Sequence, residues 1–338
     1  MDETDDLEAP PPHAGERLAR DDVLRLREEH GGPEGLDLRE ADLAKAELNE
    51  LDLHGANLAG AHLQGAHIHR ANLQGADLQR ADLHEAHLEG ANLVEAKLQG
   101  ASLEGARLKQ AHVGWADLQG AVLRRASLDA AHFIGANLQG ADFRNGYLLG
   151  VDLWQADLRR AKMAGALLRD AKLEDVHWGD YILGDEMAGD FGDATSVYRT
   201  LKQQHTEAGM YDIAGEFHYR ELEARRKLAW KERRFPYALT TNALRFLYGY
   251  GERPERVIAW AAAVILGLAL THWAFGTVAG GFLDALYYSA VSFTALGYAK
   301  WAAEPQGWAG KFLGVGESLL GVFMMALFLV TFTRKMTR

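Results

Sequence analysis

Residues 71–90 read ANLQGADLQRADLHEAHLEG, which is one five-residue pattern repeated four times. The same register runs from Leu38 to Leu173, with Leu at the centre of nearly every unit and Ala two residues earlier. It contains 28 central positions, and five of them hold another residue: Ile68, Val113, Phe133, Phe143 and Met163. So long a fixed register indicates a repeat architecture rather than an ordinary globular domain.

A period of five matches neither the 3.6 residues of a helical turn nor the two-residue alternation of a strand. Every fifth residue can face one axis only if the backbone turns a corner in each unit. Four corners give a coil of about 20 residues, so the 28 units predict about seven coils stacked over roughly 34 Å at strand spacing. The Ala and Leu positions should point inward, and glycines such as Gly55 and Gly60 should occupy corners.

The A-[D/N/H]-L-x units of residues 36–175 resemble the pentapeptide-repeat family. That resemblance implies a right-handed quadrilateral β-helix, which we place at residues 34–178. Some members of the family mimic DNA and bind topoisomerases, which requires a dense acidic surface. Here arginines such as Arg70, Arg80 and Arg107 nearly offset the acids, so we expect a cytoplasmic protein partner on the β-helix and no nucleic-acid role.

Histidines recur at the polar position of the repeat. His67 and His87 are 20 residues apart, as are His112 and His132, so each pair should stack on one face of the coil. A pair of this kind can either hold a transition metal or form a solvent-exposed polar ladder. No third ligand lies obviously in register, so the sequence favours the ladder and predicts no metal or cofactor site.

Charge divides the chain unevenly around a net value of -11. Residues 1–33 carry ten acidic and four basic residues and no signal-peptide pattern, which predicts a disordered acidic tail with room for one or two helical turns from Val23 to Glu29. Residues 199–338 carry 11 acidic and 17 basic residues, which suits an anionic lipid surface. With no Cys, the chain excludes disulfides, Cys zinc sites and Cys nucleophiles.

Two regions link the repeat to the C-terminal part. Residues 190–235 predict a helical hairpin that begins at a cap near Asp193 and turns at Ala208-Gly209-Met210-Tyr211, and it resembles a single tetratricopeptide-like unit. It would act as a spacer or bind a partner. Residues 236–256 interleave aromatic and basic residues, which predicts an amphipathic helix in the membrane interface. Four residues should cover the C-terminal end of the repeat: Trp154, Trp178, Tyr181 and Ile182.

Two apolar segments predict transmembrane helices at Val257–Phe275 and Phe312–Thr333. Basic residues precede the first segment and follow the second, whereas residues 276–311 contain only two basic residues, Lys300 and Lys311. The positive-inside rule then places both chain ends in the cytoplasm. The mean hydropathy of -0.20 conceals these segments because the long polar repeat dilutes them.

Between the spans, Phe282–Phe293 is apolar and helix-length but too short to cross a bilayer. It is followed by Thr294-Ala295-Leu296-Gly297-Tyr298-Ala299, an extended return. A short helix that enters the membrane and an extended return make a re-entrant loop, which is tolerated where it lines an aqueous pore. The helix C-terminus would direct partial negative charge at the pore axis and favour a cation.

The order span, short helix, T-x-L-G-Y, span resembles the pore module of two-helix potassium channels, over residues 257–334. The resemblance implies a homotetramer whose filter carbonyls, from Leu296, Gly297 and Tyr298, replace the hydration shell of the ion. The family filter reads T-T-V-G-Y-G-D, and three positions depart from it. Ala295 lacks a hydroxyl, Ala299 replaces a glycine, and Lys300 replaces the acid, so a weakly selective cation pore remains an alternative.

Two residues of the second span are predicted to serve the pore. Glu317 would hydrogen-bond behind the filter, with Trp301 or a pore-helix residue, unless it lies in water at the outer interface. Gly321 would be either a gating hinge or a site of close helix packing.

The sequence therefore predicts an integral membrane protein, a homotetrameric cation channel for potassium with the β-helix as regulatory or interaction domain. The alternatives are the weakly selective channel and a membrane-tethered protein-interaction scaffold without conductance. No phosphate loop or catalytic constellation is present, so no enzyme activity is expected. The permeant monovalent cation and the surrounding lipid are the only small ligands implied.

Overall fold

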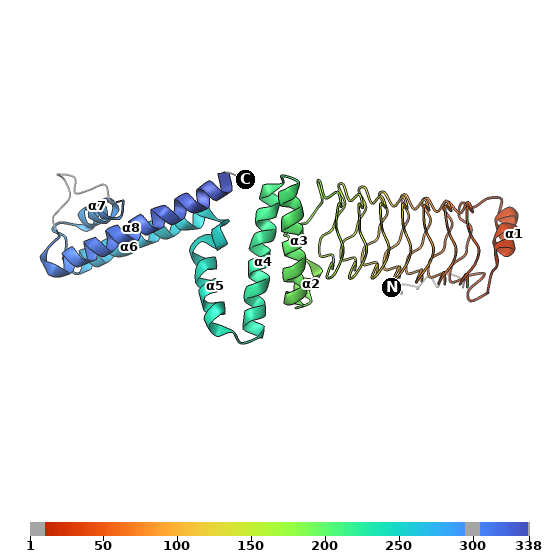
Figure 1. The fold of residues 1–338 in the computed structure, drawn as a ribbon, viewed down its shortest axis with the longest axis horizontal. Helices are drawn as coiled ribbons and strands as arrows, with labels where there is room; N and C mark the ends of the chain where they lie inside the picture. Colours follow the sequence, from red (N-terminus) through yellow and green to blue (C-terminus); the bar gives the residue numbers. More distant parts are fainter. Residues whose placement is uncertain (1–10, 295–304, 337–338) are drawn as a thin grey trace, which may run out of the picture. The chain divides into compact units, whose positions relative to one another are not determined.

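The computed structural model describes residues 11–294 and 305–336 and divides the chain into two compact units, 1–205 and 206–338. Figure 1 shows the order of the elements. The coils of the repeat are accompanied by α1 (Arg20–His30), α2 (Gly184–Met187) and α3 (Phe191–Glu207). The second unit contains α4 (Tyr211–Lys231), α5 (Phe235–Tyr248), the 3-10 turn η1 (Gly249–Gly251), α6 (Pro254–Ala274), α7 (Phe282–Phe293) and α8 (Gly307–Met336).

The repeat folds into coils of 20 residues. Each bridging residue pairs in parallel with the residue 20 positions later, from Asp37 with Asn57 to Asp157 with His177. One coil therefore holds four five-residue units, as the sequence predicts. Within the described residues this pairing consists of isolated bridges rather than continuous strands, because each side has room for only one bridging residue between two corners.

The interior of the coils is filled as expected by Ala and by Leu or its replacements. Leu88, Ala91 and Leu93 are fully buried, and Phe133 and Phe143 fill the same central position further along. The fifth residue of the units takes a positive φ at the corner. Glycine was predicted there, but charged residues also adopt this conformation, with φ of 57° at Glu50 and 53° at Arg70. The corner is therefore set by the coil and does not require glycine.

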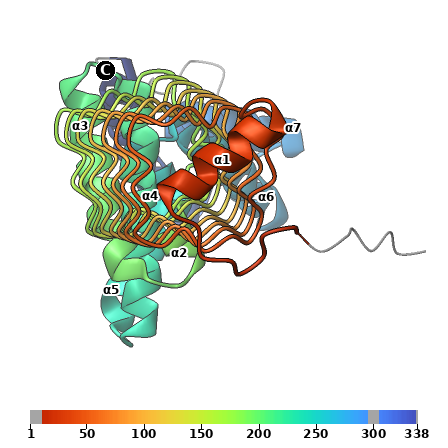
Figure 2. The same ribbon diagram turned by 90° about the vertical axis from the view of Figure 1, so that its right-hand side faces the viewer.

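The N-terminal end of the coils is covered by α1, so the prediction of a disordered tail over residues 1–33 is wrong for residues 11–33. Arg17 bridges to Asp42, and Val23 of α1 is fully buried. Figure 2 shows α1 lying across the end of the stacked coils. Residues 1–10 lie outside the described part of the chain.

Two arginines satisfy the open edge of the first coil. Backbone amides of one coil donate to carbonyls 19 residues later, in the next coil, as from Leu38 to Asn57. The corresponding carbonyls of the first coil therefore have no preceding coil whose amides could donate to them. Arg20 donates to the carbonyls of Glu47 (3.1 Å) and Asn49 (2.8 Å), and Arg27 donates to the carbonyl of Asp52 (3.3 Å). Since unpaired edges invite association, this cap protects the end of the solenoid.

The C-terminal end is closed mainly by α2 and α3 rather than by the four predicted residues. The Asp185 carboxylate accepts from the Met163 amide at 2.7 Å, and the Tyr198 hydroxyl donates to Glu186 at 2.6 Å. Of the four, Trp178 is buried as expected, whereas Trp154 is 41% exposed. The helix α3 begins at Phe191, so Asp193 lies in its first turn and is not its cap.

A buried carboxylate on the coil predicts an acid-sensitive step in stability. Burial would raise the pKa of Asp142, but hydrogen bonds from Arg144 and Arg124 lower it from 3.8 to about 2. Because the folded-state pKa is depressed, the stabilisation is complete above about pH 4 and is lost as the pH falls toward 2. The loss should be about 2 kcal/mol.

Thermal unfolding of wild type and Asp142→Asn at pH 5 and pH 2 measures this contribution, since the variant should lose less stability on acidification. Asp117→Asn is the matched control, because Asp117 is bound by Gln99 (2.7 Å) and Asn137 (2.9 Å) and not by an arginine. An equal acid response in both variants would contradict the assignment.

In the second unit, Glu223 of α4 joins the elements that precede the first span. Its carboxylate is buried and lies 2.8 Å from Arg245 Nε of α5, and it accepts from the Tyr250 hydroxyl of η1 at 3.2 Å. Asn242 of α5 accepts from Arg226 at 3.3 Å. The helix predicted near residues 211–234 is therefore α4, and α5 supplies the helix predicted in the connector. The antiparallel pairing of a hairpin over residues 190–235 stays a prediction.

Candidate functional site

The two predicted spans are helical and differ from the prediction mainly at their ends. Both α6 and the stretch Gly307–Thr333 of α8 are long and apolar enough to cross a membrane, with mean hydropathies of 1.9 and 2.1. Only 17% and 22% of these apolar windows are buried within the chain. A core helix of a soluble protein would be mostly buried, so lipid or another protein surface must cover these helices. The second helix begins at Gly307, five residues before the predicted start.

The short helix between the spans is α7. Its 12 residues rise about 18 Å, well below the roughly 30 Å of a bilayer core. The Asp284 carboxylate caps it by accepting from the Gly281 amide at 2.7 Å. The helix ends at Phe293 and is followed by its C-cap residue Thr294, whose hydroxyl donates to the Ala290 carbonyl at 2.8 Å. The remaining predicted filter residues, Ala295 to Ala299, and Trp301 lie outside the described residues.

Helices α6, α7 and α8 all contact one another. Val257, Phe293 and Met324, one from each helix, form a buried cluster flanked by Trp260 and Leu327. This cluster attaches the C-terminal end of α7 to both spans. The three helices therefore pack together around the last residues of α7.

Gly321 lies where α8 meets the end of α7. A Cβ atom at this position would overlap the carbonyl oxygen of Phe293. Ser318, one turn earlier, donates to the Ser292 carbonyl at 2.9 Å. Close packing by itself accounts for glycine at position 321, and the hinge role stays a prediction.

Glu317 is 1% exposed and lies between the three helices, not at a water-facing interface. Its Oε2 lies 3.5 Å from Nε2 of His272, and the Ser289 hydroxyl of α7 lies beside it. Neither carboxylate oxygen has a hydrogen-bond partner among the described residues, so the predicted hydrogen bond to a pore-helix residue stays a prediction. The other predicted partner, Trp301, is outside the described residues.

His272 is a contributor that the sequence analysis missed. It is fully buried near the end of α6, and its Nδ1 lies 2.7 Å from the Thr277 hydroxyl. Its ring packs edge-on against Tyr288 of α7 with centroids 5.0 Å apart. The signal was present in the sequence, because a titratable residue inside an apolar span is rare and usually has a partner.

The loops flanking α7 also pair with each other. Val278 and Pro305 form an antiparallel bridge, and the Gln306 amide donates to the Thr277 carbonyl at 2.6 Å. Thr277 therefore ties His272 to the start of α8. These contacts join the loop before α7 to the residues just before α8.

A groove of about 920 Å³ lies where α5 joins α6, lined in part by Arg245, Arg256 and Trp260. Trp260 donates from Nε1 to the Phe246 carbonyl at 3.1 Å and packs against its ring at 4.8 Å. Several apolar side chains of α5 are exposed, among them Leu239, 59%, and Phe246, 63%. Aromatic and basic side chains are typical of a membrane interface, which is where the sequence predicts residues 236–256 to lie.

Comparisons with known proteins match the two parts of the chain separately. The family described as pentapeptide repeats matches in 8 copies at residues 37–75, 71–110, 106–145 and 136–175. The family described as ion channel matches residues 257–338. A search of the curated proteins found no match.

Several solved structures of pentapeptide repeat proteins are similar to part of this chain. HetL, a pentapeptide repeat protein of heterocyst differentiation regulation from the cyanobacterium Nostoc sp. strain PCC 7120, is 32% identical and has a TM-score of 0.29, with 43% of this chain and 75% of that chain covered. A pentapeptide repeat protein of the Arabidopsis thaliana thylakoid lumen is 33% identical with a TM-score of 0.24, covering 29% and 65%. QnrB1, a plasmid-mediated fluoroquinolone resistance protein, is 23% identical with a TM-score of 0.26, covering 44% and 83%.

Neither family is enzymatic in general. The 28-unit register, the two exposed apolar helices and the short capped helix between them agree with both family matches. This membrane protein therefore belongs to the pentapeptide-repeat proteins and carries an ion channel domain at its C-terminal end.

Proposed function

We propose that the protein is a homotetrameric cation channel, with potassium as the expected permeant ion. The observation that carries this proposal is the position of α7, a 12-residue helix that ends at Phe293 and packs on both spans. The T-x-L-G-Y-A sequence follows that end directly. Four copies of this arrangement around one axis would direct four helix C-termini and four sets of carbonyl groups at a cation.

Exposed apolar surface supports assembly of several chains. Large side chains of α8 such as Phe312 (84%), Leu319 (69%) and Phe323 (60%) are exposed in the single chain. In the proposed tetramer, one part of this surface faces neighbouring subunits and the other part faces lipid. Both chain ends would lie in the cytoplasm, as the basic flanks of the spans predict.

The β-helix is proposed to regulate the pore or to bind a cytoplasmic protein. Its input would reach the pore along the chain through α4, α5 and α6. The buried Glu223 supports this route, because it holds α4 to Arg245 and Tyr250 immediately before the first span. Loss of its charge should alter opening without changing the permeation path.

Two observations favour the weakly selective alternative at the filter. Ala295 cannot supply the hydroxyl of the innermost potassium site, and Lys300 would place a positive charge near the outer mouth of the proposed pore. Ion-replacement reversal potentials distinguish the two channel hypotheses. A silent monomer or dimer would instead favour the membrane-tethered scaffold.

The experiment is flux and single-channel recording from the full chain in liposomes. We expect potassium flux in wild type and at least a tenfold loss in Gly297→Ala and Tyr298→Ala, because both changes disturb the ring of carbonyls. Glu223→Gln should keep the single-channel conductance and change the open probability. Absence of conductance in wild type under all ionic conditions would defeat the proposal, and an unchanged open probability would defeat the gating route.

A further inference from the structure

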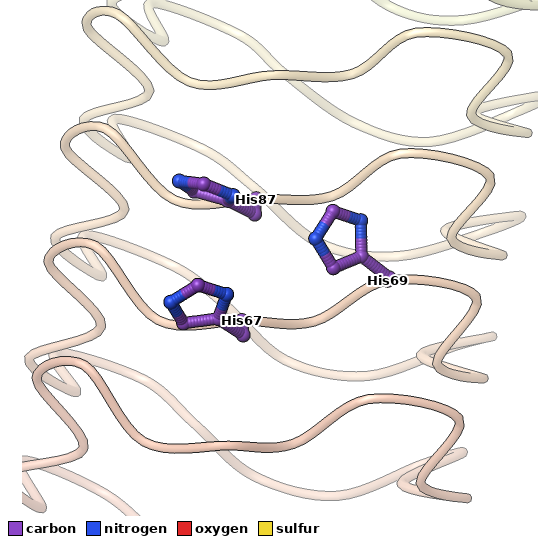
Figure 3. A group of neighbouring side chains, drawn as sticks. All are labelled: His67, His69 and His87. Carbon is purple, nitrogen blue, oxygen red and sulfur yellow. The ribbon is translucent and has the colours of Figure 1, made fainter.

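Three histidines converge on one side of the β-helix. His67 and His87 form a parallel bridge between successive coils, and their rings lie 4.6 Å apart. His69 follows His67 on the same coil, and its ring meets that of His87 edge-on at 5.5 Å. Figure 3 shows the His69 ring turned back toward the other two, so the third ligand that the sequence left out of register is supplied by the fold.

The spacing suits a transition metal. Each histidine offers one ring nitrogen, and the three nitrogens lie within 4.8 Å of one another. Around tetrahedral zinc, with Zn–N bonds of about 2.0–2.1 Å, ligand nitrogens are roughly 3.3 Å apart. The difference between these two nitrogen–nitrogen distances is small for partly exposed side chains, and the exposed fraction is 37% for both His67 and His69. Rotation of these side chains can close the set without a change in the coil backbone.

A carboxylate lies beside each of two imidazoles, those of His69 and His67. Oε2 of Glu89 lies 2.9 Å from Nδ1 of His69, and Oε1 of Glu47 lies 3.9 Å from Nε2 of His67. Neither contact is a hydrogen bond in the described structure. A ligand histidine commonly donates its second ring N–H to a carboxylate, and Glu89 is close enough to take this role at His69 once the ring rotates, whereas Glu47 adds negative charge. Arg107, which bridges to His87 on the next coil, opposes a cation, and the two carboxylates offset its charge.

The other histidine pair provides a contrast within the same fold. His112 and His132 also bridge successive coils, with stacked rings 5.2 Å apart. Gly114 and Ile134 occupy the repeat positions that correspond to His69 and Glu89. This pair therefore has neither the third imidazole nor the supporting carboxylate.

We propose that His67, His69 and His87 bind one divalent transition-metal ion of the imidazole-preferring class, such as zinc. Water or a neighbouring carboxylate completes the coordination. Because the ligands come from two successive coils, the ion joins those coils and stabilises the β-helix. The site is independent of the pore and does not require conduction.

The test is isothermal titration of the full chain in detergent with zinc alone, after chelator treatment. We expect one ion per chain with high affinity, and at least about a 100-fold loss of affinity in His67→Asn, His69→Gln and His87→Asn, since loss of an outer-shell partner already costs 10–100-fold. The repeat itself holds Asn at 72 and 92 and Gln at 64 and 74, so these substitutions fit the coil. The double variant His112→Asn/His132→Asn is the matched control and should bind as wild type.

Two further measurements distinguish a specific metal site from nonspecific binding of metal ions to the protein surface. Cobalt substituted for zinc should show the intense d–d absorption of a tetrahedral site in wild type and lose it in His69→Gln. Zinc should raise the unfolding temperature of wild type but not of the triple variant His67→Asn/His69→Gln/His87→Asn. A ligand that binds only the folded state stabilises that state. Zinc binding that survives in the triple variant, or that depends equally on His112 and His132, would overturn the proposal.

Discussion

Replacing Gly321 by Ala should abolish ion conduction and destabilise the pore module. The added Cβ would overlap the Phe293 carbonyl oxygen, at the point where α8 carries the end of α7. The backbone of Phe293 cannot rotate out of the way as a flexible side chain can, so α7 must move away from α8. Overpacking of this kind costs about 1–3 kcal/mol. Because Thr294 and the filter sequence follow at once, the same displacement would disorder the proposed ion sites.

The measurement is flux from liposomes together with thermal unfolding followed by helical circular dichroism. Gly316→Ala is the control on the same helix, since a Cβ there meets nothing within 4 Å. Alanine is a better helix former than glycine, so this control should be neutral or more stable by up to about 1 kcal/mol. If Gly321→Ala conducts and unfolds like Gly316→Ala, the tight contact between α7 and α8 is absent from the working protein.

Removing one member of the His272–Glu317 pair should be more damaging than removing both. Both side chains are fully buried, and Oε2 of Glu317 lies 3.5 Å from Nε2 of His272. His272→Leu leaves a buried carboxylate without its partner, and Glu317→Leu leaves a buried imidazole in the same situation. Leaving a buried polar group without its partner costs about 1–3 kcal/mol, whereas replacing both partners by apolar residues is often nearly neutral.

We therefore expect each single variant to lose about 2 kcal/mol and the double variant His272→Leu/Glu317→Leu to recover most of it. A double-mutant cycle on thermal or denaturant unfolding in detergent gives the coupling energy. Glu317→Gln, which can still hydrogen-bond, should fall between wild type and Glu317→Leu. Additive losses in the double variant would show that the two residues do not interact.

Conduction by the double variant separates structure from function. If the pair only supports packing, the double variant should conduct with wild-type selectivity. If its polar groups also hold the filter in place through Ser289, conduction should remain impaired after stability has recovered. Conduction by these variants therefore tests whether the pair supports the filter, a question that stability measurements alone do not answer.

Periodicity was the strongest predictor in this chain. The register of Leu38 to Leu173 gave the 20-residue coil and its inward Ala and Leu positions, because each unit faces the same environment as the unit four places away. Length and hydropathy located both spans and the short helix between them. The ends of the solenoid were predicted poorly, since a cap occurs once and has no period. Val23 was therefore assigned to a disordered tail, although it is fully buried.

The sequence by itself determined the elements whose neighbours are fixed by local spacing: the coils, the spans and the capped helix α7. Only the tertiary structure decided which side chains meet across elements. Glu317 and His272 belong to different helices, and their contact depends on how α6, α7 and α8 pack. His69 lies near His67 and His87 because the coil turns its ring back over their side. The physical reason is that a repeat or a helix specifies positions along one axis, whereas packing between elements sets the distances across it.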